Sequence, residues 1–518
     1  MYFFENLRQF ARTDRMAASL RGEELSFRQL DEESDALALW LEKYHQPRQT
    51  PVAIFGDKQN SLLCAMAGCI KGGHPYIFLP EYYPLPRLQQ LVRESGAELI
   101  IVCSDAACPL TDMPDLRQLY ANHTHPLAES VAEFMGQTAP EELCAGDDEL
   151  WMICHTSGST GKPKLVGISG RNIRAKVAYS GNIRRFFSGS QAQVVNLASF
   201  NFSMSLQCLF ADLFSFGSEL NAVDMSMLRN LATLPELLVE RQFTTFGGTA
   251  SLINRVMKSP LFSERQLPSL KVLALGGEPL PKQLVSDFFA RFPHCELVNI
   301  FGSTETCIAP LSAFITPQLL EEHPDMDIMP IGVVADVGDA VKLVNEQGAP
   351  VADGEIGEFL FEGDFIVPGY LNDPQQTAEK FYTTADGKRG FRSGDLGYRK
   401  FGYYFFVGRA NNMHKIGGYR VEMEDVENAL RQVGIVQNAA VVPVMQGGNA
   451  MMLAAYVVLN ERGAEMKKLA ATLEIKRRMA ELRPDYMIPQ KLVFVDALPV
   501  NANNKLDRQV LIDRERLG

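Results

Sequence analysis

Short β-rich runs alternate with amphipathic stretches through the first 300 residues, and this alternation restricts the chain to few folds. The stretches Ser26–Tyr44 and Pro86–Ser95 carry apolar residues near helical spacing. Strands that alternate with helices in this way predict an α/β architecture with largely parallel sheets. The strand candidates are Val52–Phe55, Leu99–Val102, Leu150–Cys154, Val194–Leu197 and Val272–Leu275.

The pattern changes after residue 330. Short strands with glycine turns at Val341–Val344, Gly357–Phe361 and Tyr403–Val407 predict a compact β subdomain over about 330–408. The run GRANN that follows predicts a hinge near 408–412. The C-terminal part reads as α+β: a helix at Glu422–Gln432, a strand at Asn438–Val442 ended by Pro443, a strand at Leu453–Leu459 and a helix across Met466–Leu482.

Length, charge and cysteine usage exclude several classes of protein. A chain of 518 residues is too long for one ordinary core, so two or more domains are expected. The net charge of −12 argues against nonspecific nucleic-acid binding and against docking on anionic lipid. Nine scattered cysteines without a C-x-x-C pair favour reduced thiols over disulfides or structural zinc. With no signal peptide and no apolar run near ~18 residues, we expect a cytoplasmic multidomain enzyme.

Residues 155–164 read HTSGSTGKPK, which combines hydroxyl side chains, glycines and lysines on a flexible backbone. Glycines permit close approach of a ligand, while hydroxyl and N–H groups donate and lysines neutralise charge. The segment is not a Walker A loop, because Gly158 and Gly161 are too close together and Pro163 follows Lys162. A polyphosphate ligand is the favoured interpretation.

Three further segments carry charged groups that suit a nucleotide. In Asn299-Ile-Phe-Gly-Ser-Thr-Glu305 a carboxylate follows an apolar stretch, and Mg²⁺ is bound by few carboxylates plus phosphate oxygens. Asp395 lies on a tight glycine turn, suited to accepting hydrogen bonds from ribose hydroxyls. Lys505 lies in the C-terminal loop NANNKLDR. Each is weak alone, since a lone loop acid or lysine is usually a solvated surface residue.

The order of these motifs resembles the adenylate-forming superfamily, which contains peptide-synthetase adenylation domains, acyl- and aryl-CoA ligases and luciferases. HTSGSTGKPK is followed by NIFGSTE, RSGDLGYR, GRANNMHKIGGYRVEMEDVE and LPVNANNKLDR. HPYIFLPEYYPLPRL at 74–88, GGEPLP at 276–281 and GEIGEFLFEGDFIVPGYLNDPQQTAEKF at 354–381 match as well. The HPYI-P-YP-P-R segment and Tyr486–Pro489 (YMIP) resemble free-standing amino-acid adenylation enzymes, particularly D-alanine–carrier protein ligases.

The resemblance implies a large N-terminal domain, residues 1–409, with two α/β sheet subdomains and a small β-barrel subdomain. A small mobile α+β domain, residues 410–518, would follow. It also implies a reaction in two halves, with ATP and Mg²⁺ as cofactors. A carboxylate attacks the α-phosphorus of ATP to give acyl-AMP and pyrophosphate, and a thiol then takes the acyl group. Such chemistry depends on positioning and charge neutralisation.

The resemblance assigns roles to individual residues. Lys505 would bridge the attacking carboxylate and the α-phosphate, Thr304 would contact that phosphate, and Glu305 would bind magnesium. Phe301 would stack on adenine beside Asn299 and Gly302, with Gly277 and Glu278 on the other wall. Asp395, supported by Arg409, would take the ribose hydroxyls. The β- and γ-phosphates would be held by Thr156, Ser157, Gly158, Ser159, Thr160, Gly161 and Lys164.

Some positions depart from the family pattern. The hinge position, usually Asp, holds Asn411, which tolerates unusual backbone dihedrals. Leu165 and Asn504 replace usual glycines beside the phosphate loop and the bridging lysine. Gly417 and Gly418 would line the route of a pantetheine arm, although an ordinary turn explains them equally well.

The acid-binding segment Phe200-Asn-Phe-Ser203 departs most. Amino-acid-activating members pair an aspartate there with the α-ammonium group, and we align Ser203 with that aspartate. Without that ion pair a buried ammonium is poorly compensated. Three accounts remain open: a substrate without an α-amine, which we favour, an amine held by another group, or a shifted alignment in which Asp212 or Asp224 serves.

The other pocket positions are mostly apolar and predict room for an apolar or aromatic group, although several could be ordinary core. Gln207 is the one neutral polar group among them and could orient an amide or hydroxyl. The aligned positions are Phe202, Met204, Gln207, Gly247, Ala274, Gly276, Ile300, Ile308 and Ala309, with Cys307 nearby.

The leading hypothesis is a ligase that loads a small carboxylic acid onto the phosphopantetheine thiol of a carrier protein, with no nucleic-acid or membrane partner. An acyl- or aryl-CoA ligase that uses free CoA is the second enzyme hypothesis, since both acceptors present the same thiol. A degenerate nucleotide-binding module is a third, and the retention of Lys505, Glu305 and Asp395 argues against it.

Overall fold

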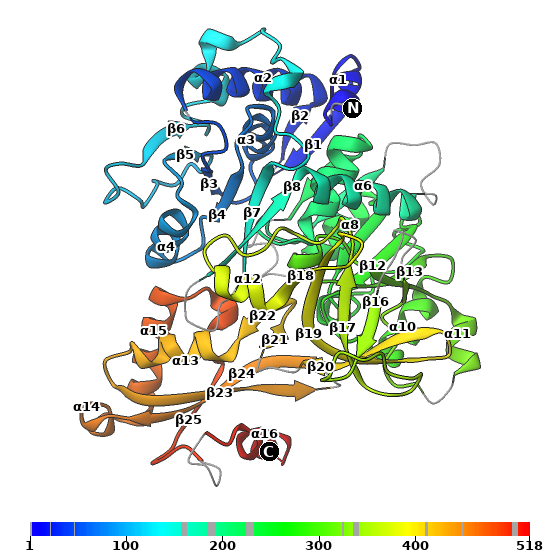
Figure 1. Ribbon diagram of the computed structural model, residues 1–518, viewed down its shortest axis with the longest axis vertical. Coiled ribbons are helices and arrows are strands. Elements are labelled where there is room, and N and C mark those ends of the chain that lie inside the picture. The colour runs from blue at the N-terminus through cyan, green and yellow to red at the C-terminus, as the bar shows by residue number, and fades with distance from the viewer. Residues whose placement is uncertain are drawn as a thin grey trace.

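The computed structural model describes residues 3–20, 22–45, 47–156, 163–184, 192–223, 233–323, 326–334, 341–409, 413–446, 449–499 and 506–517. Within these ranges the strands form four sheets, and Figure 1 shows the two α/β sheets of the first part of the chain above the C-terminal sheet. No described helix is both long enough and apolar enough to traverse a bilayer.

The first α/β sheet has the order β6-β5-β3-β4-β7-β8 and is parallel except for β8. Helices α3 (Asn60–Lys71) and α4 (Leu85–Ser95) connect its strands, as the alternating pattern predicted. The strands are β3 Val52–Gly56, β4 Tyr76–Pro80, β5 Leu99–Val102, β6 Arg117–Tyr120, β7 Leu150–Thr156 and β8 Lys164–Ser169.

The second α/β sheet has the order β15-β14-β13-β12-β11-β9-β10-β1-β2, with antiparallel strands only at its two edges. Its strands are β1 Met16–Leu20, β2 Glu23–Ser26, β9 Gln193–Asn196, β10 Glu219–Ala222, β11 Thr245–Gly248, β12 Val272–Gly276, β13 Glu296–Phe301, β14 Leu311–Ile315 and β15 Val333–Val334. The five strands predicted from the first 300 residues are all present, within two residues at each end, as β3, β5, β7, β9 and β12.

The helices of this part follow the amphipathic pattern. Ser26 caps α2 by accepting from the Gln29 N–H (3.1 Å), so the helix predicted at Ser26–Tyr44 begins one residue later. The helices are α1 Glu5–Ala11, α2 Phe27–Tyr44, α5 Leu127–Ser130, α6 Gly170–Arg184, α8 Leu234–Arg241, α9 Ala250–Val256, α10 Lys282–Arg291, α11 Pro317–Glu322 and α12 Pro374–Lys380. Short 3₁₀ turns lie at Ala132–Phe134, Glu141–Leu143, Thr304–Thr306 and Asp485–Met487, and a π-helix, η3, runs over Gln207–Ser215.

The β subdomain predicted after residue 330 is an antiparallel sheet in which β19 pairs with β17, β18 and β20. Its strands are β16 Val341–Val344, β17 Gly357–Glu362, β18 Phe381–Thr383, β19 Arg389–Lys400 and β20 Tyr403–Arg409. Pairing passes to a different sheet between Arg409 and Met413, which supports the proposed division into residues 1–409 and 410–518.

The C-terminal sheet has helices on both faces. On one face α13 (Met423–Arg431) and α15 (Lys468–Leu482) share a core, and on the other α16 (Arg508–Leu517) packs through Leu511 (Figure 1). A short helix, α14, spans Glu461–Ala464. The strands are β21 Met413–Ile416, β22 Tyr419–Glu422, β23 Val436–Gln446, β24 Asn449–Leu459 and β25 Lys491–Phe494.

The prediction that Pro443 ends its strand is wrong, because β23 continues to Gln446. Pro443 lies opposite Leu453, whose N–H donates to Gln490 Oε1 (3.0 Å) and whose carbonyl accepts from the Gln490 N–H (3.1 Å). Leu453 therefore directs its backbone groups to the other side, and β23 is an edge strand. A proline is tolerated at such a position because no ladder bond needs its nitrogen.

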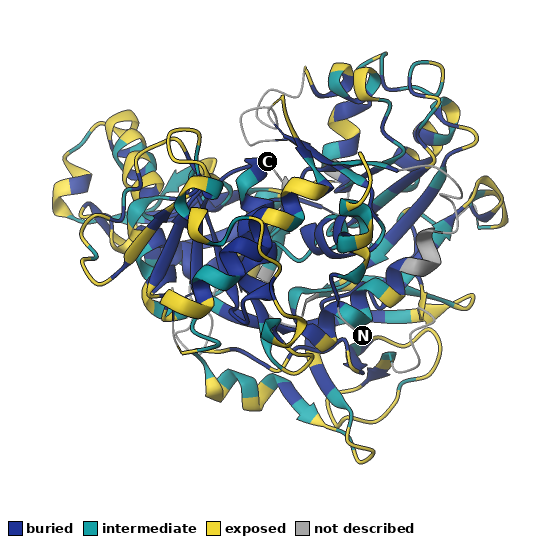
Figure 2. Cartoon of the chain, turned by 90° about the horizontal axis from the view of Figure 1, so that it is seen from above, coloured by how far each residue is buried: buried dark blue, intermediate teal, exposed yellow. Residues whose placement is uncertain are grey.

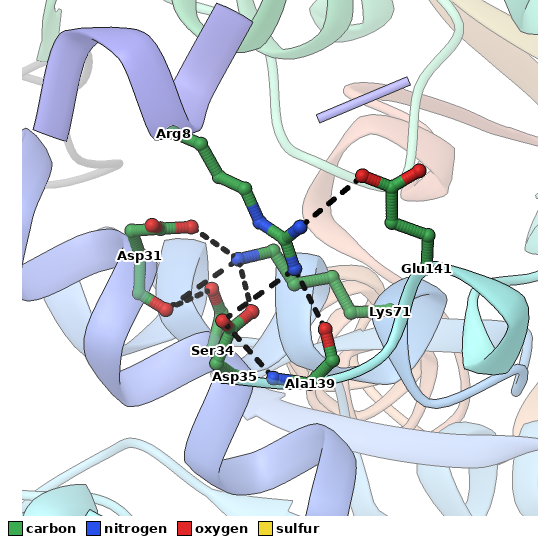
Figure 3. Close-up of polar contacts among 7 residues, drawn as sticks. All are labelled: Arg8, Asp31, Ser34, Asp35, Lys71, Ala139 and Glu141. Atoms are coloured by element: carbon green, nitrogen blue, oxygen red, sulfur yellow. Dashed lines mark hydrogen bonds and ion pairs between the residues drawn. The ribbon is translucent and has the colours of Figure 1, made fainter. Parts of the chain in front are cut away.

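Burial follows the sheets. Figure 2 shows the strands and the inner sides of the helices buried, with exposed residues gathered on outer helices and connecting loops. The charged side chains of Lys71 and Asp35 are part of this interior, between α1, α2 and α3 (Figure 3). The fully buried Lys71 ammonium lies 2.5 Å from Asp31 Oδ1 and 2.7 Å from Asp35 Oδ1, and Arg8 also approaches Asp35 (3.8 Å). Here the burial of a cation is compensated by two carboxylates.

Candidate active site

Thr304 and Glu305, two of the proposed catalytic residues, lie beyond the carboxyl end of a parallel strand, where open α/β sheets place their ligands. The 3₁₀ turn Thr304–Thr306 follows β13, and Thr156 is the last residue of β7. The Thr304 hydroxyl donates to Ser203 Oγ at 3.5 Å, although 101 positions separate the two residues in the chain. The structure therefore brings the proposed phosphate contact and the acid-binding segment together.

Glu305, the proposed magnesium ligand, is fully buried. Its Oε1 accepts from the Tyr370 hydroxyl at 2.8 Å. The Lys164 ammonium lies over the same tyrosine, 5.9 Å from its ring centroid, and donates to Glu422 Oε1 at 2.6 Å. A carboxylate and a cation thus both contact Tyr370, and the cation is held by a residue of the C-terminal part.

Several proposed wall residues are in close contact. A Cβ at Gly276 would lie 2.6 Å from Ile300 Cγ1, so β12 and β13 approach too closely there for any other residue. A Cβ at Gly302 would lie 2.4 Å from the Ile308 carbonyl oxygen. Gly277, with φ of +86°, faces Gly418, whose Cα lies 3.9 Å from the position of such a Cβ. Glu278 follows directly, and Ala309 is buried beside Ile308.

Phe301 and Asn299 belong to the end of β13. The Phe301 ring centroid lies 5.7 Å from those of Phe359 and Phe406, and the Lys415 ammonium lies 5.7 Å from the same centroid. The Asn299 amide donates to the Pro330 carbonyl oxygen at 2.8 Å. The proposed adenine-stacking ring is thus supported by the β subdomain.

Asp395, the proposed ribose contact, is buried on β19. Its backbone N–H donates to Ser393 Oγ (2.9 Å), and it stands opposite Arg409 in the β19–β20 register. Of Arg409 only the backbone is described.

The proposed acid-binding side is formed by the segment after Phe200, by η3 and by β11 and β12. The Phe202 ring centroid lies 4.9 Å from that of Tyr419, and Gly247 pairs with Ala274. Gln207 begins η3 directly after Met204-Ser-Leu. Its Oε1 accepts from Ser180 Oγ (2.6 Å) and its Nε2 lies 3.5 Å from both carboxylate oxygens of Asp212.

Seven proposed site residues lie outside the described residues: Ser157, Gly158, Ser159, Thr160, Gly161, Asn411 and Lys505. Asp224, one of the alternative amine contacts, does too. Leu506, the residue after Lys505, is described and packs with the α16 face of the C-terminal sheet, among Ala440, Val442 and Tyr456.

Asn201 was missed by the sequence analysis, although its position carried a signal. Counted along Phe200-Asn-Phe-Ser203, the aspartate of an F-D-x-S segment corresponds to Asn201, which is 1% exposed. Its Nδ2 lies 3.1 Å from the Tyr83 hydroxyl and 3.1 Å from His155 Nε2, and its Oδ1 has no hydrogen-bond partner among the described residues. We therefore assign Asn201, like Ser203 a neutral residue, to the position of the missing carboxylate.

His155 supports Asn201 as a neutral acceptor. Burial, with a smaller contribution from the positive charge of Arg87, lowers the pKa of His155 from 6.5 to about 3. The ring is therefore uncharged at neutral pH, and its Nε2 accepts from the Asn201 amide. The groups hydrogen-bonded to the Asn201 amide, the Tyr83 hydroxyl and the His155 ring, are thus neutral.

The described residues fit a nucleotide with magnesium. A buried carboxylate (Glu305), a threonine hydroxyl (Thr304) and a lysine (Lys164) converge where phosphates would be bound. No cluster of three or more His, Cys, Asp or Glu side chains that could hold a metal occurs in the described part of the chain. Mg²⁺ needs no such cluster, because phosphate oxygens and water supply its other ligands.

The fold and the site define an AMP-forming ligase. Residues 3–371 match the family described as AMP-binding enzyme and residues 425–505 match the AMP-binding enzyme C-terminal domain, so the chain belongs to the AMP-binding enzyme family. The resemblance inferred from the motifs is thereby confirmed.

Two groups of known proteins are similar over nearly the whole chain. The D-alanine–D-alanyl carrier protein ligases of Bacillus cereus (strain G9842) and Bacillus anthracis are each 31% identical over 507 residues, with 96% of both chains covered. Among solved structures, a Vibrio cholerae adenylation domain in complex with glycyl-adenosine-5'-phosphate has a TM-score of 0.82 at 22% identity, covering 100% of this chain and 97% of that one. The o-succinylbenzoate CoA synthetase of Bacillus subtilis has a TM-score of 0.79 at 20% identity, with 98% of each chain covered. The structural similarities confirm the predicted fold class, with a large N-terminal and a smaller C-terminal domain.

Proposed function

We propose that this enzyme uses ATP to activate a small carboxylic acid as its acyl-AMP and then transfers the acyl group to the phosphopantetheine thiol of a carrier protein. The observation that carries the proposal is the convergence of Thr304, Glu305 and Lys164 with the acid-binding segment at Ser203. The full-length similarity to carrier protein ligases supports a carrier as the acceptor.

In the first half-reaction the acid's carboxylate oxygen attacks the α-phosphorus, and pyrophosphate leaves. Thr304 donates its hydroxyl toward that phosphate, and Lys505, with Lys164, neutralises the charge that develops on the phosphate oxygens. Glu305 would hold Mg²⁺, which when bound supplies further charge neutralisation. Tyr370 keeps the Glu305 carboxylate oriented through its 2.8 Å hydrogen bond.

In the second half-reaction a thiol sulfur attacks the acyl carbon, the bond to the phosphate oxygen breaks and AMP leaves. Gly418 lies next to Gly277 and Thr249, at the edge of the proposed nucleotide site, and Gly417 precedes it in an open turn. Because neither glycine carries a side chain, a thin pantetheine arm could pass there. In the same arrangement of the two parts of the chain, Lys164, the lysine proposed to bind phosphates, is neutralised by its ion pair with Glu422.

The acid is proposed to lack a conventionally bound α-amine. Asn201 stands at the position of the carboxylate that would pair with an ammonium, and the nearby Ser203 and His155 are neutral as well. An α-ammonium desolvated against neutral groups is poorly compensated.

ATP–pyrophosphate exchange with a panel of carboxylic acids tests the proposal. At least one acid should support exchange, and the product should then be loaded onto a phosphopantetheinylated carrier faster than onto free CoA. Faster transfer to CoA would favour a CoA ligase, and no exchange with any acid would refute the enzyme assignment.

Lys505→Ala tests the assignment of the bridging lysine. Loss of a preorganised cation should slow exchange by about 100-fold or more, while transfer from supplied acyl-AMP continues. Normal exchange in this variant would refute the role of Lys505.

A further inference from the structure

Three lysines are buried in the part of the chain that the structure describes, and contacts within the protein compensate two of them. Lys71 has two carboxylates, as described above. Lys58 is 2% exposed, and its ammonium donates to the Ala198 carbonyl oxygen (2.5 Å) and lies 4.1 Å from the Phe200 ring centroid. Lys176 is 7% exposed, yet among the described residues its ammonium has no hydrogen-bond or ion-pair partner. An unpaired buried charge is costly, so the third lysine needs an explanation.

The position of Lys176 on α6 shows what it faces. Residues four apart on a helix share one face. One turn before it, the Asn172 carbonyl oxygen lies 3.7 Å from Cys307 Sγ, and one turn after it Ser180 Oγ donates to Gln207 Oε1. Lys176 therefore lies between Cys307 and Gln207, both of which belong to the proposed acid-binding side.

Electrostatics agrees with this placement. Burial lowers the pKa of Lys176, and the groups that counteract burial are Cys307, Cys208 and Asp212, from the two elements that face α6. Burial likewise holds the thiols of Cys307 and Cys208 at pKa values of about 12, so they carry no charge at neutral pH. Asp212, which lies 3.5 Å from the Gln207 amide, is the one acid among these groups and is beyond ion-pair distance from Lys176.

We propose that Lys176 binds a second carboxylate, at the far end of the acid substrate, and so makes the enzyme selective for dicarboxylic acids. This inference rests on the proposed function, because it names the chemistry of the acid that the same site activates. One carboxylate would be placed for reaction beside Thr304, and the other would pair with the buried ammonium. Ile300, Ile308 and Ala309, all apolar, suit the methylenes between them.

The charge at this site is then opposite to that required by a simple amino acid. Neutral Asn201 stands where a carboxylate would attract an ammonium, and a buried lysine supplies a cation instead. A site built to bind a charged group rejects analogues that lack it, because its own buried group is then left unpaired.

ATP–pyrophosphate exchange with matched acids tests the proposal in the full-length protein. The panel pairs the dicarboxylic acids from malonate to adipate with monocarboxylic acids of equal chain length, and adds aspartate and glutamate with glycine and D-alanine as their neutral counterparts. The comparison of dicarboxylic with monocarboxylic acids detects recognition of a distal carboxylate on an acid without an amine. The comparison of aspartate and glutamate with glycine and D-alanine detects recognition of a distal carboxylate on an amino acid. In the wild type we expect the acid with a distal carboxylate to exceed its counterpart by at least about tenfold in kcat/KM.

Lys176→Met keeps a long side chain without the charge, and Lys176→Gln is the second variant. Both should remove that preference, raising KM for the dicarboxylic acid by about tenfold or more while KM for ATP is unchanged. Lys58→Met is the matched control, a buried lysine with fixed partners, and should lower exchange for all acids alike. The melting temperature of Lys176→Met should not fall, because no protein partner is lost.

A preference that is the same in wild type and both Lys176 variants would overturn the inference, as would a uniform loss of exchange and stability like that of the Lys58 control. Protection against thermal unfolding by glutarate, present in the wild type and absent in Lys176→Met, provides a readout that needs no catalysis. If no acid supports exchange but this protection is observed, the proposed function fails and the inference stands. If exchange favours monocarboxylic acids, the proposed function stands and the inference about Lys176 fails.

Discussion

At the scale of single residues, the site is distinguished by side chains that burial keeps neutral. His155 is 2% exposed and accepts a hydrogen bond from Asn201, which can happen only while its Nε2 is unprotonated. Protonation would replace an acceptor with a donor against an amide that already donates. The position of Asn201 in the proposed acid-binding segment therefore depends on a neutral His155 imidazole.

This neutrality predicts a pH-dependent stability. The pKa of His155 is about 3 in the folded protein and 6.5 without burial, so between these values the unfolded chain binds a proton that the folded chain does not. Stability must then fall as the pH decreases from 6.5 toward 3. His155→Gln should shrink the difference in melting temperature between about pH 7.5 and about pH 5.

His123 provides a control of opposite sign. It is exposed, and Glu23 and Asp105 raise its pKa, so its contribution to stability is present at low pH and lost as the pH rises. His123→Gln should therefore leave the acid-induced decrease undiminished. An unchanged pH profile in His155→Gln would show that the imidazole is not held neutral.

At the scale of elements, periodicity predicted what depends on local pattern. The strands β3, β5, β7, β9 and β12 follow from short β-rich runs, because strands inside a covered parallel sheet are buried on both faces. The helices α2, α4 and α15 follow from apolar residues at helical spacing. The end of β23 did not follow, because tolerance of Pro443 depends on which neighbour Leu453 pairs with. The π-helix η3 has no sequence signal of its own that distinguishes it from an α-helix.

The same division applies to the site. Motifs predicted Thr304, Glu305 and Asp395, because the proposed contacts with phosphate, metal and ribose restrict the residue types that can make them. Lys176 escaped because a lysine on an amphipathic helix resembles a solvated residue. Its low exposure and the contacts of Asn172 and Ser180 on the same helix show that it faces the interior.

The β21–β22 hairpin gives a prediction at this scale. A Cβ at Gly418 would lie 2.5 Å from Thr249 Cγ2, whereas one at Gly417 would meet nothing within 4 Å. Both glycines have positive φ, +55° at Gly417 and +86° at Gly418, so alanine strains the backbone at either position by about 1 kcal/mol. Gly418→Ala should therefore slow acyl transfer to the thiol by about tenfold more than Gly417→Ala, with pyrophosphate exchange less affected.

A second substitution isolates the clash. Thr249→Ser removes Cγ2 but keeps the hydroxyl that caps α9 by accepting from the Leu252 N–H. The double variant Gly418→Ala/Thr249→Ser should recover to the rate of Gly417→Ala. Failure to recover would mean that backbone strain, rather than contact with Thr249, limits the hairpin.

At the scale of the whole molecule, the C-terminal part is docked by its β21–β22 hairpin and by the Asp485–Met487 turn. Tyr419 stacks on Tyr486 at 4.1 Å between ring centroids, and the Tyr486 hydroxyl lies 3.4 Å from that of Tyr83. Phe202 packs against Tyr419. Meanwhile Leu506, next to Lys505, packs with α16 on the opposite face of the C-terminal sheet from α13 and α15. This arrangement presents the glycine hairpin to the site and suits the transfer step.

The ion pair between Lys164 and Glu422 allows a test of whether the docked arrangement serves the transfer step. It joins β8 to β22 at 2.6 Å, with side chains only 13% and 8% exposed, and it occupies the lysine proposed to bind phosphates. Glu422→Gln removes the charge but keeps the shape, so it should weaken the docked arrangement and leave Lys164 available to ATP.

In this variant, acyl transfer from preformed acyl-AMP should slow by about tenfold, because one partly buried charged contact is lost, while pyrophosphate exchange is retained or increased. Glu481→Gln, which removes two exposed ion pairs within α15, should change neither half-reaction. Equal losses in both half-reactions of Glu422→Gln would show that the pair supports the fold as a whole, and not one arrangement of the two domains.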